Sequence, residues 1–299
     1  MKKINVKLEE KNKKILVSKY IQSIFKNVPY SSICKAFRNK DIRINNVKIS
    51  KDTVVSNDDI LEIYIPDNIL FNLPKKIEYY YSDDNILIAY KPQGILSNDE
   101  NKNNSLEPNF EELVIKDQGN INLKICHRLD RNTSGIIIFA KNDLAYTEIL
   151  NGFKNNKIHK EYIAYVANTR FNKTHDILEA YLSKDSKTAY SKISMQPTKN
   201  SEQILTEYFV LETNLKLDYA KLKVILHTGK THQIRAHLAS INHPIIGDSK
   251  YGKNEINKKF NKNRQMLFAY KYSFTFDSDS ILNYLNKITV EIEKLRTEF

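Results

Sequence analysis

The beginning of the chain combines a polar start with two short helical patterns. Residues 1–14 are polar and Lys-rich without periodicity, so we expect them to form a flexible basic tail. Apolar side chains then recur at the i, i+3, i+4 and i+7 spacing of one helix face, at Val17, Tyr20, Ile21 and Ile24. Val28-Pro29 ends this helix, and Ser31 is the predicted N-cap of a second helix.

A predicted hairpin and a further strand follow these helices. Residues 42–49 alternate between apolar and polar types around Asn45-Asn46, and Asn tolerates the positive φ of a tight turn. Ile60–Ile65 predicts the next strand. We therefore expect a small α/β domain over residues 15–66, followed by a proline-bounded linker over residues 67–76.

Strand patterns dominate the rest of the chain. They lie at Asn85–Tyr90, Gly135–Ala140, Glu161–Ala167, Leu205–Glu212 and Ala220–His227. Helical patterns follow two predicted caps, Asp143 and Thr231, and a C-terminal helix is predicted over Ser280–Arg296. The expected fold class is α+β, with a large mixed, mostly antiparallel sheet and flanking helices over residues 77–299, in addition to the small N-terminal domain.

Composition narrows the possible classes of protein. The 299 residues are 41% hydrophobic, which is enough to bury a core, and the longest apolar run, Ile136–Ala140, is far too short to cross a membrane. The N-terminus lacks the apolar segment of a signal peptide. Two cysteines, Cys34 and Cys126, cannot form a four-thiolate metal site, and we expect them to be free thiols. A soluble, cytoplasmic protein is therefore predicted.

The net charge indicates a polyanionic partner. Lys and Arg together number 47 against 35 Asp and Glu, which gives a formal charge of +12. An ordinary solvated surface on a Lys-rich chain is the alternative explanation. We favour polyanion binding because basic residues recur beside the motifs described next.

The densest polar motif is His127-Arg128-Leu129-Asp130-Arg131-Asn132-Thr133-Ser134-Gly135, directly before an apolar strand. The arginines on either side of Asp130 stabilise the charged form of its carboxylate. Such a carboxylate is a poor general base at neutral pH but is well suited to act as a nucleophile. The alternative interpretation is a surface salt bridge at the start of a strand.

A second motif, Thr228-Gly229-Lys230-Thr231-His232-Gln233-Ile234-Arg235-Ala236-His237-Leu238, leads from a strand into a predicted helix. Exposed backbone N–H groups at the start of a helix favour phosphate. Arg235 lies one turn into the helix, away from the apolar side formed by Ile234 and Leu238. Zinc is disfavoured, because the spacings between His227, His232, His237 and His243 do not place the imidazoles on one helix face.

Two further segments carry weaker signals. Lys91-Pro92-Gln93-Gly94 predicts a rigid exit from a strand, and a core strand with a turn is its simplest interpretation. In Lys160–Val166, the alternation places Tyr162 on one face with Ala164 and Val166. A buried structural tyrosine is the simplest interpretation there.

Together these segments closely resemble the RluA family of pseudouridine synthases in order and spacing. The resemblance covers roughly residues 77–275, it includes His243–Gly252 downstream, and the HRLDR-x-TSG element is highly specific for the family. Residues 15–66 look like the alpha-L RNA-binding domain, shared with a small-subunit ribosomal protein, that many members acting on ribosomal RNA carry. The chain departs from the family pattern at Asn132, Lys230 and Phe268, where Asp, Arg and His are more usual.

The resemblance implies an isomerase that converts specific uridines in RNA to pseudouridine, after the nucleotide is flipped out of its stack. It assigns the nucleophilic carboxylate to Asp130 and the residue paired with it to Arg235. Tyr162 would pack against the target base and could assist removal of the C5 proton. The reaction exchanges neither atoms nor electrons with another molecule, so we expect no cofactor and no metal.

RNA is the expected partner. The alpha-L resemblance favours large-subunit ribosomal RNA over transfer RNA, and we expect a monomer without membrane attachment. Arg128 is the candidate to hold the opened RNA, and the other expected RNA contacts are Arg131, Lys35, Arg38, Arg43, Lys48, Lys230 and His232. The alternative from another class is a non-catalytic RNA-binding factor on the same scaffold, which the presence of Asp130, Tyr162 and Arg235 disfavours.

Overall fold

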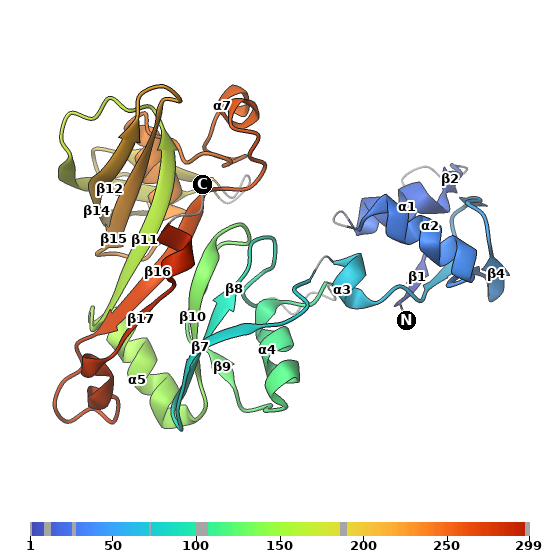
Figure 1. Ribbon diagram of the computed structural model, residues 1–299, viewed down its shortest axis with the longest axis horizontal. Coiled ribbons are helices and arrows are strands. Elements are labelled where there is room, and N and C mark those ends of the chain that lie inside the picture. Colours follow the sequence, from blue (N-terminus) through green and yellow to red (C-terminus); the bar gives the residue numbers. More distant parts are fainter. Residues whose placement is uncertain are drawn as a thin grey trace. The chain divides into compact units, whose positions relative to one another are not determined.

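Two separate units make up the chain, residues 1–76 and residues 77–299 (Figure 1). The structure, a computed structural model, describes residues 2–8, 13–25, 28–71, 73–99, 107–185 and 190–296. Over these described residues, no helix is both long and apolar enough to cross a membrane.

The first unit packs short helices against small sheets. Its helices are α1 (Val17–Ile24), α2 (Tyr30–Asn39) and α3 (Asp67–Leu70). Its strands are β1 (Lys2–Asn5), β2 (Ile15–Leu16), β3 (Ile42–Ile44), β4 (Val47–Ile49), β5 (Val54–Val55) and β6 (Ile60–Ile63). The order β1-β6-β3-β4 forms an antiparallel sheet, and β2 pairs with β5. Ile21, Ile33 and Ile63 are fully buried in this unit.

The predicted helix over Val17–Ile24 and the predicted hairpin are both confirmed. The two turn residues, Asn45 and Asn46, have φ angles of 49° and 68°. The flexible tail predicted over residues 1–14 is wrong for its first part, because Lys2–Asn5 forms β1 and pairs with β6. Val6 continues the alternation and is buried, so this apolar signal outweighs the surrounding lysines.

Helix α2 does not begin where the sequence pattern placed it. Pro29 is its N-cap and the helix begins at Tyr30, so the predicted cap Ser31 lies inside the first turn. The connection predicted as a linker contains α3, and Phe71 directly after it packs edge-on against Phe25 with ring centroids 5.2 Å apart. This part of the connection therefore belongs to the first unit.

The second unit is built on one large sheet. Its strands are β7 (Glu78–Ser82), β8 (Ile86–Lys91), β9 (Lys124–Ile125), β10 (Ser134–Ala140), β11 (Ile158–Ala167), β12 (His175–Lys184), β13 (Ser191–Ser194), β14 (Ser201–Asn214), β15 (Tyr219–Leu226), β16 (Leu267–Phe274) and β17 (Thr289–Glu291). Its helices are α4 (Phe110–Gln118), α5 (Asp143–Lys154), α6 (Gln233–Ser240) and α7 (Asn254–Lys259), with 3-10 helices η1 (Asn283–Lys287) and η2 (Glu293–Arg296).

The order of strands places one parallel pair near the middle of this sheet. The order is β13-β12-β14-β15-β11-β16-β10-β8-β7, with β17 beside β16 and β9 beside β10. Among the described strands, every pair in this sheet is antiparallel except β10 and β16, which align Ser134 with Phe268 and Gly135 with Ala269. The predicted α+β class with a mixed, mostly antiparallel sheet is thus confirmed.

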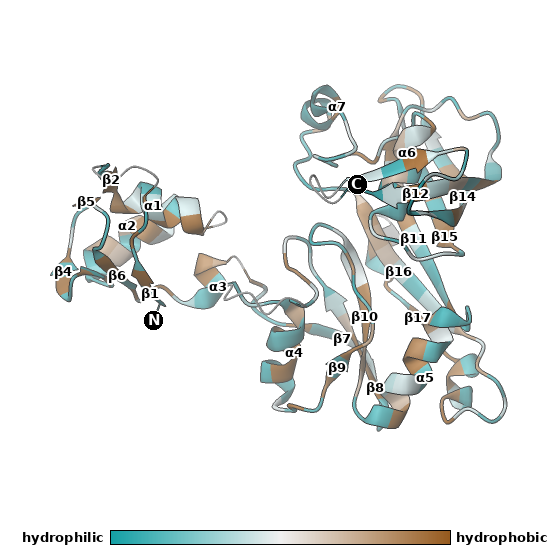
Figure 2. Ribbon diagram, turned by 180° about the vertical axis from the view of Figure 1, so that it is seen from behind, coloured by the Kyte–Doolittle hydropathy of each residue, from teal (hydrophilic) through white to brown (hydrophobic). Residues whose placement is uncertain are grey.

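Gly135 permits the close approach of β10 to β16. Its φ is +136°, which L side chains rarely adopt, and a Cβ at this position would lie 2.6 Å from the backbone nitrogen of Ala269. Every residue of β10 is buried, and Figure 2 shows hydrophobic colour along this strand against the hydrophilic colour of α7. The loop before β10 is therefore fixed at the middle of the sheet.

The sequence patterns in the second unit are confirmed for strands β8, β10, β11, β14 and β15. The predicted helix caps are wrong by one residue, since Asn142 caps α5 by accepting from the N–H of Ala145, and His232 precedes α6. The helix predicted over Ser280–Arg296 is also wrong, because this segment forms η1, β17 and η2.

Candidate active site

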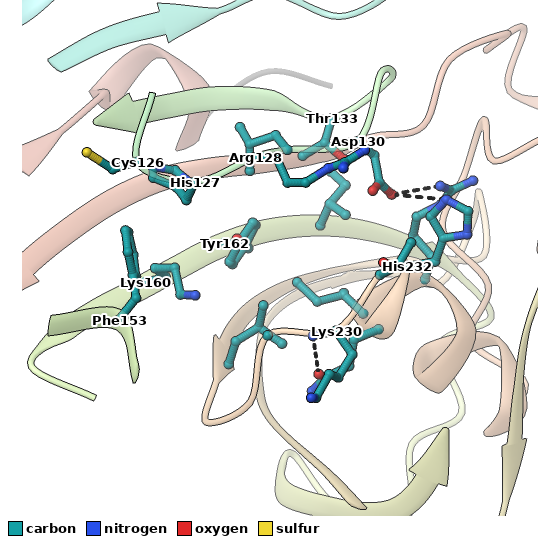
Figure 3. A pocket seen from close by; sticks show the side chains of 18 of the residues that line it. Cys126, His127, Arg128, Asp130, Thr133, Phe153, Lys160, Tyr162, Lys230 and His232 are labelled. Carbon is teal, nitrogen blue, oxygen red and sulfur yellow. Dashed lines mark hydrogen bonds and ion pairs between the residues drawn. The ribbon is translucent and has the colours of Figure 1, made fainter. Parts of the chain in front are cut away.

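Adjacent strands of the large sheet bring the polar motifs together. Asp130 lies in the loop before β10, Tyr162 lies on β11, and Arg235 lies on α6, which follows β15. Because β15, β11, β16 and β10 are neighbours in that order, Asp130 and Arg235 meet although they are 105 residues apart in sequence. All three residues line one cavity of about 330 Å³ (Figure 3).

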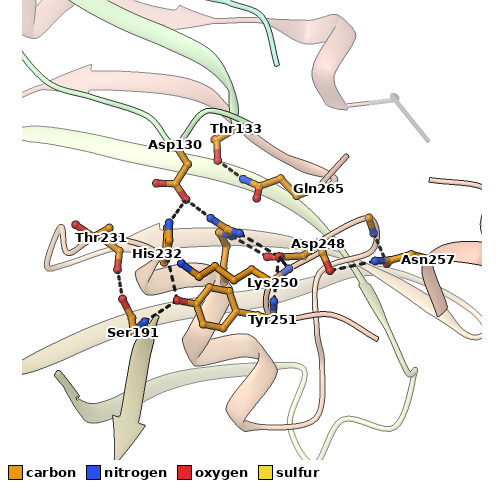
Figure 4. A network of polar contacts seen from close by, with 12 residues as sticks. Asp130, Thr133, Ser191, Thr231, His232, Asp248, Lys250, Tyr251, Asn257 and Gln265 are labelled. Atoms are coloured by element: carbon orange, nitrogen blue, oxygen red, sulfur yellow. Dashed lines mark hydrogen bonds and ion pairs between the residues drawn. The ribbon is translucent and has the colours of Figure 1, made fainter. Parts of the chain in front are cut away.

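Arg235 binds two carboxylates at once (Figure 4). Its Nη1 donates to Oδ2 of Asp130 at 2.7 Å. Its Nε and Nη2 donate to the two oxygens of Asp248 at 2.7 and 3.0 Å. Asp248 also accepts from the backbone N–H groups of Lys250 and Tyr251. Asp248 therefore fixes the plane of the guanidinium group, and the guanidinium in turn fixes Asp130.

Charge and exposure distinguish the two carboxylates. Burial opposes ionisation of Asp248, but the hydrogen bonds and charge of Arg235 outweigh burial and lower the pKa of Asp248. Burial also opposes the charge of Arg235, but Asp248 and Asp130 outweigh it and raise the pKa of Arg235. The side chain of Asp248 is 0% exposed and that of Asp130 is 24% exposed. Of the two, only Asp130 is accessible to a ligand in the cavity.

Tyr251 and His232 complete the surroundings of the ion pair. The ring of Tyr251 lies 5.2 Å from the guanidinium carbon of Arg235, and its hydroxyl lies 2.9 Å from Nδ1 of His232. His232 places Nε2 3.8 Å from Oδ2 of Asp130. Burial lowers the pKa of His232 although the charge of Asp130 opposes this shift, so the imidazole is mainly neutral at neutral pH. Arg235 is thus the cation that holds Asp130.

A fully buried lysine holds the loop that carries Asp130. Nζ of Lys91 donates to the carbonyl oxygens of Pro92, Ile95 and Arg131 at 3.0, 2.9 and 3.2 Å. Burial lowers the pKa of Lys91 to about 7, and the charge of Asp130 opposes this shift. The Lys-Pro-x-Gly segment, which the sequence alone suggested to be a simple strand exit, therefore positions the loop beside it.

Tyr162 separates the ion pair from the apolar end of the cavity. Figure 3 shows its side chain with Asp130 on one side and with Phe153 and Lys160 on the other. Burial raises the pKa of Tyr162, and the charge of Asp130 raises it further. The phenol therefore stays protonated and offers a flat, neutral face to the cavity.

Comparison with known proteins identifies the family. The family model described as RNA pseudouridylate synthase matches residues 85–240. The chain is 31% identical to the ribosomal large subunit pseudouridine synthase C of Buchnera aphidicola subsp. Baizongia pistaciae, over 89% of this chain and 88% of that one. It is also 31% identical to the ribosomal large subunit pseudouridine synthase D of Borreliella burgdorferi, over 85% and 78% of the two chains. The chain belongs to this family.

Solved structures agree with this fold for the pseudouridine synthase. Human RNA pseudouridylate synthase domain containing 1 aligns with a TM-score of 0.58 and 22% identity, over 73% of this chain and 82% of that chain. Human RNA pseudouridylate synthase domain containing 4 aligns with a TM-score of 0.54 and 19% identity, over 72% and 87%. The resemblance to the RluA family is confirmed, and the chain is an RNA pseudouridine synthase, an isomerase.

The RNA-contact residues predicted in the second unit of the synthase differ in whether they line the cavity and in their ion-pair partners. Arg128 is exposed and lines the cavity, and its contact with RNA stays a prediction. Arg131 forms an ion pair of 2.8 Å with Glu107 and does not line this cavity. Lys230 lines the cavity, but its ammonium group is paired with Glu202 of β14.

The four RNA-contact residues predicted in the first unit also differ in exposure and in ion pairing. Lys35 and Arg38 are exposed on α2, and Lys48 is exposed on β4. Arg43 lies across from Lys48 in the hairpin, 4.0 Å from a carboxylate oxygen of Glu62. Three of the four side chains are thus open to a polyanion, and Arg43 is partly neutralised within the unit.

Asp248 is the main residue of the site to which the sequence motifs assigned no role. It stands in the segment His243–Gly252, which was part of the family resemblance. Its pairing with Arg235 depends on the turn after α6, which returns the chain over 13 residues to the guanidinium group. Asp248 stood in a segment that the sequence analysis included, but the sequence did not predict the direction in which the chain turns after α6.

Proposed function

We propose that this synthase isomerises specific uridines in large-subunit ribosomal RNA and that Asp130 is the reacting carboxylate. The observation that carries the proposal is the ion pair of 2.7 Å between Asp130 and Arg235, in a cavity that Tyr162 also lines. This arrangement combines an accessible carboxylate, a fixed cation and a flat aromatic ring. These are the groups that the chemistry below requires.

The isomerisation breaks the N1–C1′ bond of uridine, turns the uracil and forms a C5–C1′ bond. C5 loses a proton and N1 gains one, so the atoms and electrons of the nucleotide balance without a second reactant. A carboxylate can assist by adding to C6 of uracil or by attacking C1′ of the ribose. Both routes need an oriented carboxylate, and the contact with Arg235 orients Asp130.

The other residues of the site act through position and charge. Arg235 orients Asp130, and Asp248 fixes Arg235 in turn. Tyr162 packs against the uracil ring. Because burial and the charge of Asp130 raise the pKa of Tyr162, we assign it the role of a neutral phenol rather than of a base that takes the C5 proton.

Ribosomal RNA is the substrate that the surface and the relatives support best. The exposed Lys35, Arg38 and Lys48 supply sequence-independent phosphate affinity outside the cavity. The relatives from Buchnera and Borreliella are both named for the large ribosomal subunit. We assign to Arg128, which is exposed at the cavity, the role of occupying the stack that a flipped uridine leaves.

The substrate is tested by mapping pseudouridines with carbodiimide-blocked primer extension, in cells with and without the gene. We expect one or more stops to disappear from large-subunit ribosomal RNA in the cells that lack it. Stops that disappear from transfer RNA alone would contradict the ribosomal assignment. An unchanged map of both RNA classes would contradict the proposed activity in these cells.

The role of Asp130 is tested in the purified enzyme. Asp130→Ala should abolish pseudouridine formation, because no other accessible carboxylate reaches the ion-pair site among the described residues. RNA affinity should remain largely intact, because phosphate contacts lie elsewhere. Measurable turnover by this variant, on RNA that it binds normally, would contradict the assignment of Asp130.

A further inference from the structure

Lys160 is a cation in the cavity for which the proposed chemistry has no use. It lies on β11 two residues before Tyr162 and lines the same cavity. Its Nζ lies 5.0 Å from the ring centroid of Phe153. Within the described part of the chain, this ammonium group forms neither an ion pair nor a hydrogen bond, and burial lowers the pKa of Lys160.

Two other cations that line the cavity are neutralised by carboxylates. Arg235 is held by Asp130 and Asp248, and Lys230 is paired with Glu202. The groups around Lys160 are apolar or neutral. His127, beside it, accepts a hydrogen bond from the N–H of Ile138, and burial and the charge of Lys160 lower the pKa of His127 to about 3. An unpaired, partly buried charge is costly, and a negatively charged ligand removes this cost.

Lys160 places its ammonium group beside an exposed glycine of the cavity wall. Gly229 is exposed, lines the cavity and has no side chain, and a Cβ at this position would lie 3.4 Å from Nζ of Lys160. Gly229 and Lys160 therefore lie side by side at the cavity wall, where residue 229 has no side chain to cover the ammonium group. Figure 3 shows Nζ of Lys160 on the same side of Tyr162 as Phe153, at the opposite end from Asp130.

We propose that Lys160 binds a backbone phosphate of the RNA next to the flipped uridine, at the cavity wall beside Gly229. This inference rests on the proposed function, because it assumes that a nucleotide enters this cavity. A phosphate supplies the negative charge that the site lacks, whereas a uracil carbonyl supplies only a dipole. Lys160 would thus anchor the strand at one end of the cavity while Asp130 reacts at the other.

The test compares Lys160→Met and Lys160→Arg with a matched control, Lys223→Met. Lys223 also lies over an aromatic ring, at 4.2 Å from Phe209, but it does not line the cavity. Affinity is measured for a synthetic RNA hairpin that contains the mapped uridine, over a range of salt concentrations. We expect Lys160→Met to weaken binding about tenfold or more and to reduce the salt slope by roughly 0.7–0.9. Lys160→Arg should restore most of the affinity, and Lys223→Met should stay within about twofold of wild type.

A methylphosphonate scan of the same hairpin identifies the phosphate. Neutralising one phosphate beside the uridine should weaken wild-type binding about tenfold and should cost little in Lys160→Met. Wild-type binding that is insensitive at every position near the uridine would overturn the proposal, even if Lys160→Met does not fold. Equal sensitivity of wild type and Lys160→Met would also overturn it, and so would equal losses in Lys160→Met and Lys223→Met. A wild-type enzyme that binds this RNA without forming pseudouridine contradicts the proposed function instead.

Discussion

At the scale of single residues, the shape of the Arg235 side chain decides how the site works. A guanidinium group is planar and rigid, so the two contacts to Asp248 fix the direction in which Nη1 points. Nη1 then determines where the accessible oxygen of Asp130 lies. The buried carboxylate of Asp248 therefore determines, through Arg235, where the carboxylate of Asp130 lies in the cavity.

We predict that Arg235→Lys lowers the single-turnover rate by about 100-fold or more, because an ammonium group cannot bind both carboxylates in the required directions. RNA binding should change little, since Arg235 points to carboxylates rather than to solvent. Single-turnover kinetics with saturating RNA measures this rate. The exposed Arg170 provides the matched control, and Arg170→Lys should keep the wild-type rate. An Arg235→Lys enzyme within about twofold of wild type would show that Arg235 does not orient Asp130.

Lys91 links stability to pH. Burial lowers the pKa of Lys91 to about 7 against the opposing charge of Asp130, and the value in an unfolded chain is about 10.4. Between these values the unfolded chain holds more protons, so this group makes the free energy of unfolding rise with pH from about 7 to about 10.4 and has no further effect below about 7. Lys91→Met should remove this rise and should also destabilise the protein by about 2–5 kcal/mol, because three carbonyl groups lose their donor.

Urea unfolding of both proteins at about pH 7 and about pH 9.5 measures the effect of Lys91. The difference in free energy of unfolding between wild type and Lys91→Met should grow at the higher pH. A difference that is equal at both pH values would mean that Lys91 has an ordinary pKa in the folded state.

The sequence indicated the residues proposed to react better than the residues that hold them in place. Asp130 and Arg235 stand in motifs whose local order is informative, and they form an ion pair in the structure. The pairing of Asp248 with Arg235 depends on a turn of the chain, and Lys91 binds backbone carbonyl groups. Neither contact leaves a local pattern in the sequence. Arg131 stands beside Asp130 in sequence but pairs with Glu107 and does not line the cavity, and its contact with RNA stays a prediction.

At the scale of helices and strands, tertiary pairing explains where the sequence patterns failed. The segment Ser280–Arg296 has apolar residues at helical spacing, and most of them are buried, but Val290 pairs with Tyr272 of β16 as part of a strand. Short 3-10 turns fill the space on either side of this strand. Pairing with β16 therefore outweighed the local helical preference of this segment. A local sequence pattern cannot reveal such pairing, because the partner strand lies elsewhere in the chain.

The parallel pairing of β10 and β16 gives a prediction at this scale. Gly135→Ala should destabilise the second unit by about 3 kcal/mol or more, because the added Cβ would enter the backbone of Ala269 in an unfavourable φ region. Activity should fall as well, since the Asp130 loop leads directly into this contact. Thermal unfolding and single-turnover kinetics measure the two effects.

Gly119→Ala is the matched control for Gly135→Ala. Gly119 also has a positive φ, 62°, but apart from its chain neighbours no atom of the described residues lies within 4 Å of the position that a Cβ would take. We expect it to cost only about 1 kcal/mol of backbone strain and to leave activity unchanged. Equal destabilisation by both substitutions would show that the contact with Ala269 contributes nothing beyond backbone strain.

At the scale of the whole molecule, the two units divide the proposed tasks. The residues assigned to chemistry all lie in residues 77–299, and the exposed Lys35, Arg38 and Lys48 lie in residues 1–76. Removing residues 1–76 should leave a folded enzyme whose single-turnover rate at saturating RNA changes much less than its affinity. Its salt slope for RNA binding should be shallower, by roughly 0.7–0.9 for each lost phosphate contact.

Binding titrations at several salt concentrations, on the natural RNA fragment, compare the shortened and full-length enzymes. Circular dichroism confirms that the shortened enzyme is folded before it is used. Unchanged affinity and salt slope would show that residues 1–76 do not bind RNA. The main structural reason for preferring ribosomal RNA as the substrate would then be lost.

The alignment of Ser134 with Phe268 has a consequence for how the enzyme is made. The two residues are 134 positions apart, so at 5–20 residues per second a ribosome adds Phe268 roughly 7–27 s after Ser134. Until then the strand after Asp130 has no parallel neighbour, and Arg235 emerges before the strand that closes the sheet. A nascent or prematurely terminated chain therefore carries every proposed catalytic residue without a formed site, and it cannot modify RNA while it is still on the ribosome.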